Sequence, residues 1–185
     1  TVSVTGVSLD ITSKTLNVGG QVTLTPTVAP ANATNKNVSW SSSAPSVATV
    51  VNGVVTAVTP GSATITVTTE DGGKTATCSI TVNPILVTGV TVSPASLNMT
   101  EGDKQDLSAT VTPDNATDKS LTWTSSNTSV ATVDNSGKVT AVAAGSATIT
   151  ATSNDGSNKS GSCLVTVTAK TISVTGVSLD ITSKT

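Results

Sequence analysis

The chain lacks most of the residue types from which active sites are built. It contains no His, Tyr, Phe or Arg, and only two Trp, two Cys and one Met. Its 11 carboxylates mostly lie in predicted turns, so the sequence offers no base-activated nucleophile, no Gly-rich phosphate loop and no zinc cluster. We therefore predict that the chain is not an enzyme and that it has no catalytic residue, no cofactor site and no metal site.

Charge is also scarce. Only 11% of the residues are charged, all nine cations are Lys, and the net charge is −2 with a pI near 4.8. This balance argues against nucleic acid or an anionic membrane as a partner. The sequence has no apolar run of about 18 residues and no basic-plus-apolar leader, so we expect neither membrane insertion nor a signal peptide within this segment.

Small β-branched and hydroxyl-bearing residues are abundant instead. Ser and Thr make up about a third of the chain, and Val dominates the apolar residues. These residues suit a pleated surface, and few of the remaining residues favour helix. The composition therefore predicts an all-β, extracellular protein.

The sequence contains an internal repeat. The motif VTGV occurs at 4–7, at 87–90 and at 174–177, and the motif GSATIT occurs at 61–66 and at 145–150. The period of about 85 residues is the size of a domain and too long for a solenoid repeat. We therefore expect tandem domains of one fold rather than a continuous superhelix.

The repeats divide the chain into copies. We predict a first domain over 1–84, a second over 85–169, and the first strand of a third, truncated copy over 170–185. The last fifteen residues, 171–185, repeat residues 1–15 with only Val2 changed to Ile172. Such a restart is typical of an array cut from a longer chain, or of one continued by a partner molecule.

Within one copy, alternating apolar residues and turn residues predict about seven strands. The short sequence Asn52-Gly53 is a tight hairpin signal, and its counterpart at 134–137 is one residue longer. Pro60-Gly61 is a second strong turn signal. The expected strands of the first copy are 4–9, 21–28, 38–40, 47–50, 54–58, 63–69 and 75–82.

The same alternation predicts the core. With no other aromatic residue in the first copy, Trp40 is expected to fill the centre, and Trp40→Ala is expected to cost about 3 to 5 kcal/mol. Cys78 and Cys163 occupy equivalent positions in different copies, so each should face its own core and they should not pair. The predicted structural core residues are Trp40, Trp123, Cys78, Cys163, Ile65 and Ile149.

The order of these motifs carries a family resemblance. VTGV, WSS, SVATV, GVVTAV, GSATIT and CSITV follow one another in the first copy, and VTGV, SVATV and GSATIT recur in the same order in the second. This order closely resembles the bacterial immunoglobulin-like domains of group 2, over both copies and the start of a third. The resemblance implies Ig-like β-sandwiches, used as repeated modules in bacterial surface proteins, intimin and invasin-like adhesins, secreted enzymes and phage virion proteins. It brings no catalytic residues.

Two weaker site hypotheses remain. Glu70, Asp71 and Asp155 lie in the loop before the last strand of each copy and Asp10 lies near a domain end, so calcium at a domain junction is one interpretation. We favour the alternative that these acids form and solvate turns. A sugar platform would need exposed aromatic rings, and the only candidates are the two tryptophans that the cores require.

We expect the function to be structural: a repeat module of an extracellular or cell-surface bacterial protein, or of a phage virion, that forms a rod or filament. The alternative is an adhesin or virion-decoration module whose loops bind a surface glycan or protein receptor. The expected partners are neighbouring copies of the same domain, including a head-to-tail homopolymer.

The repeated end leaves two alternatives open for such assembly. It is either an excerpt of a covalent array or a strand that completes the sandwich of another molecule. The residues of this inter-repeat or inter-subunit strand are Val174, Val177, Leu179 and Ile181.

Overall fold

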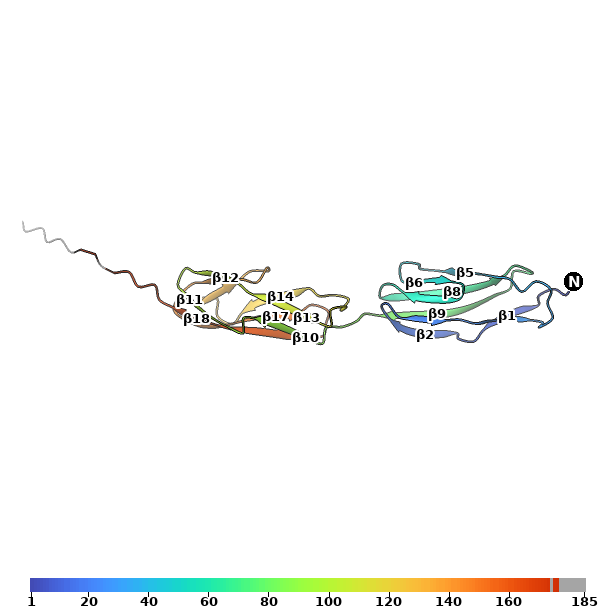
Figure 1. The fold of residues 1–185 in the computed structure, drawn as a ribbon, viewed down its shortest axis with the longest axis horizontal. Coiled ribbons are helices and arrows are strands. Elements are labelled where there is room, and N and C mark those ends of the chain that lie inside the picture. The colour runs from blue at the N-terminus through green and yellow to red at the C-terminus, as the bar shows by residue number, and fades with distance from the viewer. Residues whose placement is uncertain (174, 177–185) are drawn as a thin grey trace, which may run out of the picture. The chain divides into compact units, whose positions relative to one another are not determined.

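Every regular element in the described part of the chain is a β-strand. The computed structural model describes residues 1–173, 175 and 176. They form two compact units, Thr1–Leu86 with Asn115–Thr117, and Val87–Asp114 with the described residues from Asp118 onward (Figure 1). The described residues form no helix, so none of them belongs to a helix long and apolar enough to cross a membrane. The predicted all-β fold is confirmed.

The described residues give nine strands in each copy. Those of the first copy are β1 (Gly6–Leu9), β2 (Ser13–Asn17), β3 (Gln21–Thr23), β4 (Pro26–Ala29), β5 (Val38–Ser42), β6 (Ala48–Val51), β7 (Val54–Ala57), β8 (Gly61–Thr69) and β9 (Thr75–Asn83). Those of the second are β10 (Gly89–Ser93), β11 (Ser96–Thr100), β12 (Lys104–Asp106), β13 (Ser108–Thr112), β14 (Leu121–Ser125), β15 (Ala131–Val133), β16 (Lys138–Ala141), β17 (Gly145–Ser153) and β18 (Ser160–Thr168).

The strands of each copy form the two layers of a sandwich. In the first copy one layer is the four-stranded sheet β2-β9-β8-β5, and the other contains the three-stranded sheet β3-β7-β6. The short pair β1-β4 continues the second layer, because β4 follows β3 after only two residues. The second copy repeats this arrangement with β11-β18-β17-β14, β12-β16-β15 and β10-β13.

Two features of the strand pattern differ from the sequence-based expectation. The predicted strand 21–28 is divided into β3 and β4, because its backbone changes partner: the Leu24 N–H donates to the Gly53 carbonyl, whereas the Thr25 N–H donates to Asp10. The strand β2 was not expected at all. It pairs in parallel with β9, and a parallel pair has no hairpin turn between its strands to announce it.

The predicted hairpin turn at Asn52-Gly53 is confirmed. Both residues have positive φ, 50° and 82°, and Val51 pairs with Val54 across the turn. Positive φ at both central residues is what the two-residue type I′ turn requires, and Asn-Gly is its preferred sequence. In the second copy the longer loop between β15 and β16 ends at Gly137, whose φ is 87°.

The core of the first copy lies between its two layers. β8 and β9 place their buried residues at every second position, as a half-buried strand does. The fully buried large apolar side chains of this copy are Leu24, Ile65, Ile80, Val55, Val67 and Cys78. The corresponding set in the second copy includes Ile149, Val139, Val165 and Cys163.

Candidate functional site

The segment that precedes the first strand is fastened to the first copy by hydrogen bonds from two loops. The Val2 N–H donates to the Thr34 hydroxyl at 2.9 Å, and the Thr34 N–H donates back to the Val2 carbonyl at 2.9 Å. Two residues later, the Val4 N–H donates to Asp71 Oδ2 at 2.8 Å, and the Val4 side chain is buried. We call Thr34 and Asp71 the segment clamp of this copy.

The same clamp recurs on the segment that leads into the second copy. The Ile85 N–H donates to the Thr117 hydroxyl at 2.8 Å, and the Thr117 N–H donates to the Ile85 carbonyl at 2.8 Å. The Val87 N–H donates to Asp155 Oδ2 at 2.5 Å. Val87, like its counterpart Val4, is buried, so the anchoring of the leading segment is a property of the repeat.

Asp155 is the most strongly perturbed acid in the described chain. Hydrogen bonds from the Ser157 hydroxyl and then from the Val87 N–H lower the pKa of Asp155 from 3.8 to about 2. Both donors stabilise the carboxylate rather than the acid form. Asp155 therefore acts as an anionic acceptor that ties the leading segment to the β17–β18 turn.

The other acids that suggested calcium have similar local roles. Glu70 Oε2 accepts hydrogen bonds from the Asn35 and Asn37 amides, and Asp10 Oδ1 accepts one from the Thr25 N–H. The Thr25 backbone N–H lowers the pKa of Asp10. Within residues 1–173, 175 and 176, no three acidic, Cys or His side chains gather as metal ligands do.

The two cysteines lie where the sequence places them, each on the last strand of its own copy. Both are free and buried, and burial raises the pKa of both thiols; the Asp10 charge adds to this effect at Cys78. A buried neutral thiol is a poor nucleophile. Cys78 and Cys163 therefore act as small apolar side chains of the core. The other two predicted core residues of this kind, Ile65 and Ile149, are also fully buried.

The tryptophans lie at the margin of the core rather than at its centre. Trp40 is partly buried and packs against the core cluster, because β5 is an edge strand of the four-stranded sheet. A Cβ added at Gly53 would lie 3.2 Å from Trp40 Cζ2, so the ring abuts the hairpin turn. Trp123 has the same relation to Gly137, at 3.0 Å. The sequence pattern identifies both rings as core residues but does not reveal which strands are edges.

Each tryptophan also forms part of a shallow surface groove. The groove has a volume of ≈ 320 Å³ at Trp40 in the first copy and of ≈ 390 Å³ at Trp123 in the second. We call these the tryptophan grooves. The first is lined by Trp40, Ser41, Ser42, Pro45, Thr49, Val50 and Val51. The second is lined by Trp123, Thr124, Ser125, Thr128, Thr132 and Val133.

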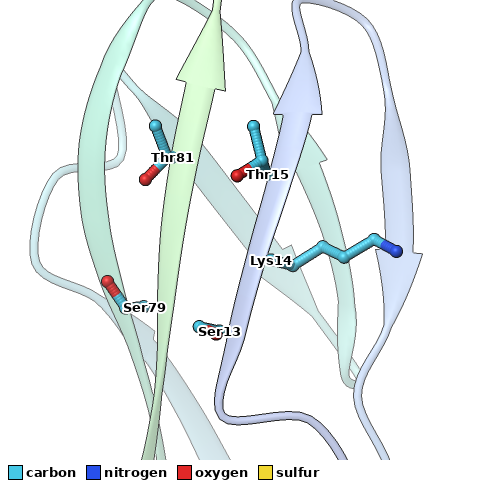
Figure 2. Close-up of a pocket in the computed structure, with 5 residues that line it drawn as sticks. All are labelled: Ser13, Lys14, Thr15, Ser79 and Thr81. Atoms are coloured by element: carbon cyan, nitrogen blue, oxygen red, sulfur yellow. The ribbon is translucent and has the colours of Figure 1, made fainter.

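A third depression lies on the outer face of the four-stranded sheet of the first copy. It has a volume of ≈ 390 Å³ and lies where β2 runs beside β9. Figure 2 shows its hydroxyl side chains, with Ser13 opposite Ser79 and Thr15 opposite Thr81, and with Lys14 extending away from them. This lining offers hydroxyl groups and one ammonium group, which suit hydrogen bonding, and it contains no base to activate a nucleophile.

The predicted inter-repeat strand cannot be placed alongside these features. Val174, Val177, Leu179 and Ile181 lie outside the described residues. The segment clamp, by contrast, was not foreseen from the sequence. The signal was present as a Thr in one loop and an Asp in another, repeated in both copies, but 37 residues separate Thr34 from Asp71, and only the fold brings them to the same segment.

Comparison with known proteins adds a family match and several relatives. The model of the bacterial Ig-like domain (group 2) matches residues 3–80 and 86–163. An uncharacterized protein of Clostridium acetobutylicum is 37% identical over 166 residues, which cover 89% of this chain and 17% of that protein. An Ig-like virion protein of Serratia phage KSP90 is 41% identical over 155 residues, covering 81% of this chain and 60% of that protein.

Other matches show how small a part of some relatives the chain represents. A 3-O-alpha-D-galactosyl-alpha-L-arabinofuranosidase of Bifidobacterium longum is 48% identical over 104 residues, covering 48% of this chain and only 9% of the enzyme. Among solved structures, domains 4 and 5 of the S-layer protein SbsC align with a TM-score of 0.43 and 24% identity, covering 90% of this chain and 99% of that one.

Proposed function

Because the chain belongs to the bacterial Ig-like domain (group 2) family, we propose that it is a non-catalytic spacer module of an extracellular, cell-surface or virion protein. The relatives support this proposal because proteins of very different kinds contain similar sequences. A virion protein and a glycosidase share the module, and its match covers a small part of the enzyme. A role common to such different proteins is mechanical and independent of the chemistry beside it.

The observation that carries the proposal is the short connection between the copies. Asn83 ends β9, and its carbonyl accepts a hydrogen bond from the Val18 N–H. The next anchored residue is Ile85, which is held by Thr117. Only Pro84 lies between these two anchored residues, and its ring fixes its own φ near about −65°. A connection with one conformationally restricted residue differs from a flexible tether, which gains its reach from many free residues.

We therefore propose that successive copies are joined stiffly enough to act as a rod. Small-angle X-ray scattering of the chain tests this proposal against two variants. In one, a Gly-Gly-Ser-Gly insertion follows Asn83. In the other, Thr117→Val and Asp155→Ala remove the side-chain acceptors of the clamp. The matched control is Asp134→Ala, because Asp134 accepts hydrogen bonds only within its own hairpin loop.

The expected result is a narrow distribution of interatomic distances for the unmodified chain and for the control. The insertion should broaden this distribution strongly and the clamp variant less so, while circular dichroism of all four proteins stays that of β-sheet. If the unmodified chain scatters like the insertion variant, the connection acts as a flexible tether and the rod proposal is wrong.

A further inference from the structure

We propose that each copy carries a binding site for one ring of a neutral sugar polymer, at its tryptophan groove. This inference is independent of the spacer role, because it concerns a surface that the connection between the copies does not use. It begins with an observation repeated in the two copies. Both grooves contain the partly buried indole of an edge strand, β5 or β14, together with Ser and Thr hydroxyls.

The indole nitrogen of each groove tryptophan is a free donor. Among the described residues, neither Trp40 Nε1 nor Trp123 Nε1 donates to a protein acceptor, and no buried side-chain nitrogen or oxygen lacks a partner. Both indole N–H groups are therefore accessible to solvent. An indole N–H without a protein acceptor can donate to a ligand that lies against the ring.

The rings are also held in position. The glycine of the adjacent turn, Gly53 or Gly137, leaves no space for a side chain between the turn and the indole. The Ser42 hydroxyl, in the wall of the first groove, donates to the Ala48 carbonyl at 2.6 Å, and its counterpart Ser125 donates to the Ala131 carbonyl at 2.7 Å. Because the ring is held in place and the serine hydroxyl of the wall is already hydrogen-bonded, the groove loses little conformational entropy when it binds a ligand.

The lining indicates which chemistry fits. No charged residue lines either groove, so an ionic ligand gains no complementary charge there. A pyranose ring presents C–H groups on one face and hydroxyls around its edge. The C–H groups suit the electron-rich face of the indole, and the hydroxyls suit the indole N–H and the Ser and Thr side chains. Volumes of ≈ 320 and ≈ 390 Å³ lie near the lower end of the roughly 300–1,000 Å³ range of ligand pockets.

Comparison of the two copies separates this occupant from a protein partner. The first groove has an apolar rim, with Val51 68% exposed. At the equivalent place after β15 the second copy has Asp134. A hydrophobic protein contact would need the apolar rim in both copies. What the two copies share is the indole and the hydroxyls, which are the groups that a sugar requires.

The protein offers a direct optical test, because its only two tryptophans are the two groove rings and it has no Tyr. We would titrate the full chain with three neutral polymers, laminarin, galactan and mannan, and with the anionic polymer polygalacturonate. Tryptophan emission and retardation in native affinity gels would be measured. We expect at least one neutral polymer to change the emission saturably and to retard the chain, and polygalacturonate to do neither.

Variants locate the site. Thr49→Glu with Thr132→Glu places one charge in each groove, and the matched control, Thr77→Glu with Ser162→Glu, places the same charges on exposed positions of β9 and β18 outside both grooves. The groove variant should weaken retardation by at least about tenfold and the control by less than about twofold. If the groove variant fails to fold, Ser41→Lys with Thr124→Lys serves the same purpose, since both residues line the grooves and are exposed.

Three results would overturn the proposal. The first is that none of the neutral polymers retards the unmodified chain. The second is equal retardation of the groove and control variants. The third is an emission change that follows protein concentration in the absence of sugar, which would assign the grooves to a second copy of the chain.

Discussion

Replacing Gly53 by Ala tests the packing of the hairpin turn against the tryptophan. Gly53 has φ of +82°, and an added Cβ would lie 2.7 Å from the Leu24 carbonyl oxygen and 3.2 Å from Trp40 Cζ2. Gly19 has the same φ of +82°, but nothing lies within 4 Å of its added Cβ. The two substitutions therefore share the backbone penalty and differ only in the steric contact.

The magnitudes follow from these two contributions. A left-handed conformation costs a residue with a Cβ about 1–2 kcal/mol, and the reduced freedom of the unfolded chain returns about 0.4–1 kcal/mol. Gly19→Ala should therefore lower the free energy of unfolding by about 1 kcal/mol. Gly53→Ala adds a clash with a backbone carbonyl, which cannot rotate away as a side chain can. With an overpacking cost of about 1–3 kcal/mol, its total is about 2–4 kcal/mol.

Urea denaturation of a fragment of residues 1–86, followed by the emission of its single tryptophan, measures both values. With an m-value of about 1 kcal/mol/M, an additional cost of about 2 kcal/mol separates the two midpoints by about 2 M. The second copy repeats the comparison: Gly137 would place a Cβ 2.8 Å from the Leu107 carbonyl oxygen, whereas Gly102 has nothing within 4 Å. Equal midpoints within both pairs would refute the proposed packing of turn against indole.

Three further predictions concern the core, the clamp and metal. Ile65→Ala, at a fully buried position, should cost about 2–5 kcal/mol, whereas Ser62→Ala on the outer face of the same strand should change the free energy of unfolding by less than about 0.5 kcal/mol; both are measured by urea denaturation. The depressed pKa of Asp155 stabilises the folded chain above the unfolded value of 3.8, and this contribution is lost as the pH falls toward about 2. The stability difference between the chain and Asp155→Asn should therefore disappear over that range in acid titrations, and a constant difference would contradict the assigned role. Thermal melts with excess chelator and with millimolar calcium should coincide; a calcium-dependent rise of several degrees would reinstate the calcium interpretation of the acidic loops.

The parts of the fold that the sequence predicts are those determined by neighbouring residues. Asn52-Gly53 specifies its turn because both residues tolerate positive φ, and the alternation along β8 and β9 specifies which side chains face inward. The parallel strand β2 cannot be predicted from neighbouring residues in this way. Only Leu16 of its five residues is partly buried, and its partner β9 lies some 60 residues later in the chain.

The candidate sites depend even more on tertiary structure. Trp40 is recognisable as a core residue, but its place at the margin follows from β5 being the last strand of its sheet, which no local pattern encodes. The clamp joins Thr34 and Asp71 through the backbone of Val2 and Val4. Because Asp71 binds the Val4 backbone N–H, the sequence holds no complementary side chain that would reveal the clamp, and it suggests only turn formation or calcium binding for Asp71.

The two copies differ in a way that indicates where a shared function can lie. On the four-stranded sheet, the outward cross-strand pair Thr66–Thr77 of the first copy corresponds to Thr150–Ser162 of the second, and both pairs keep their hydroxyls. Such pairs contribute roughly 0.2–1 kcal/mol each, which matters in a chain whose cores contain no Phe or Tyr.

The outer face of the three-stranded sheet has changed instead. The facing residues Thr23 and Val54 of the first copy correspond to Asp106 and Lys138 of the second, and the latter two form an ion pair at 3.8 Å. Both partners of that pair are exposed, so it contributes little to stability, and the exchange was free to occur. Properties that the two copies share therefore belong to the outward hydroxyl pairs of the four-stranded sheet, the clamp and the tryptophan groove, whereas the outer face of the three-stranded sheet is where one copy acquires a surface that its neighbour lacks.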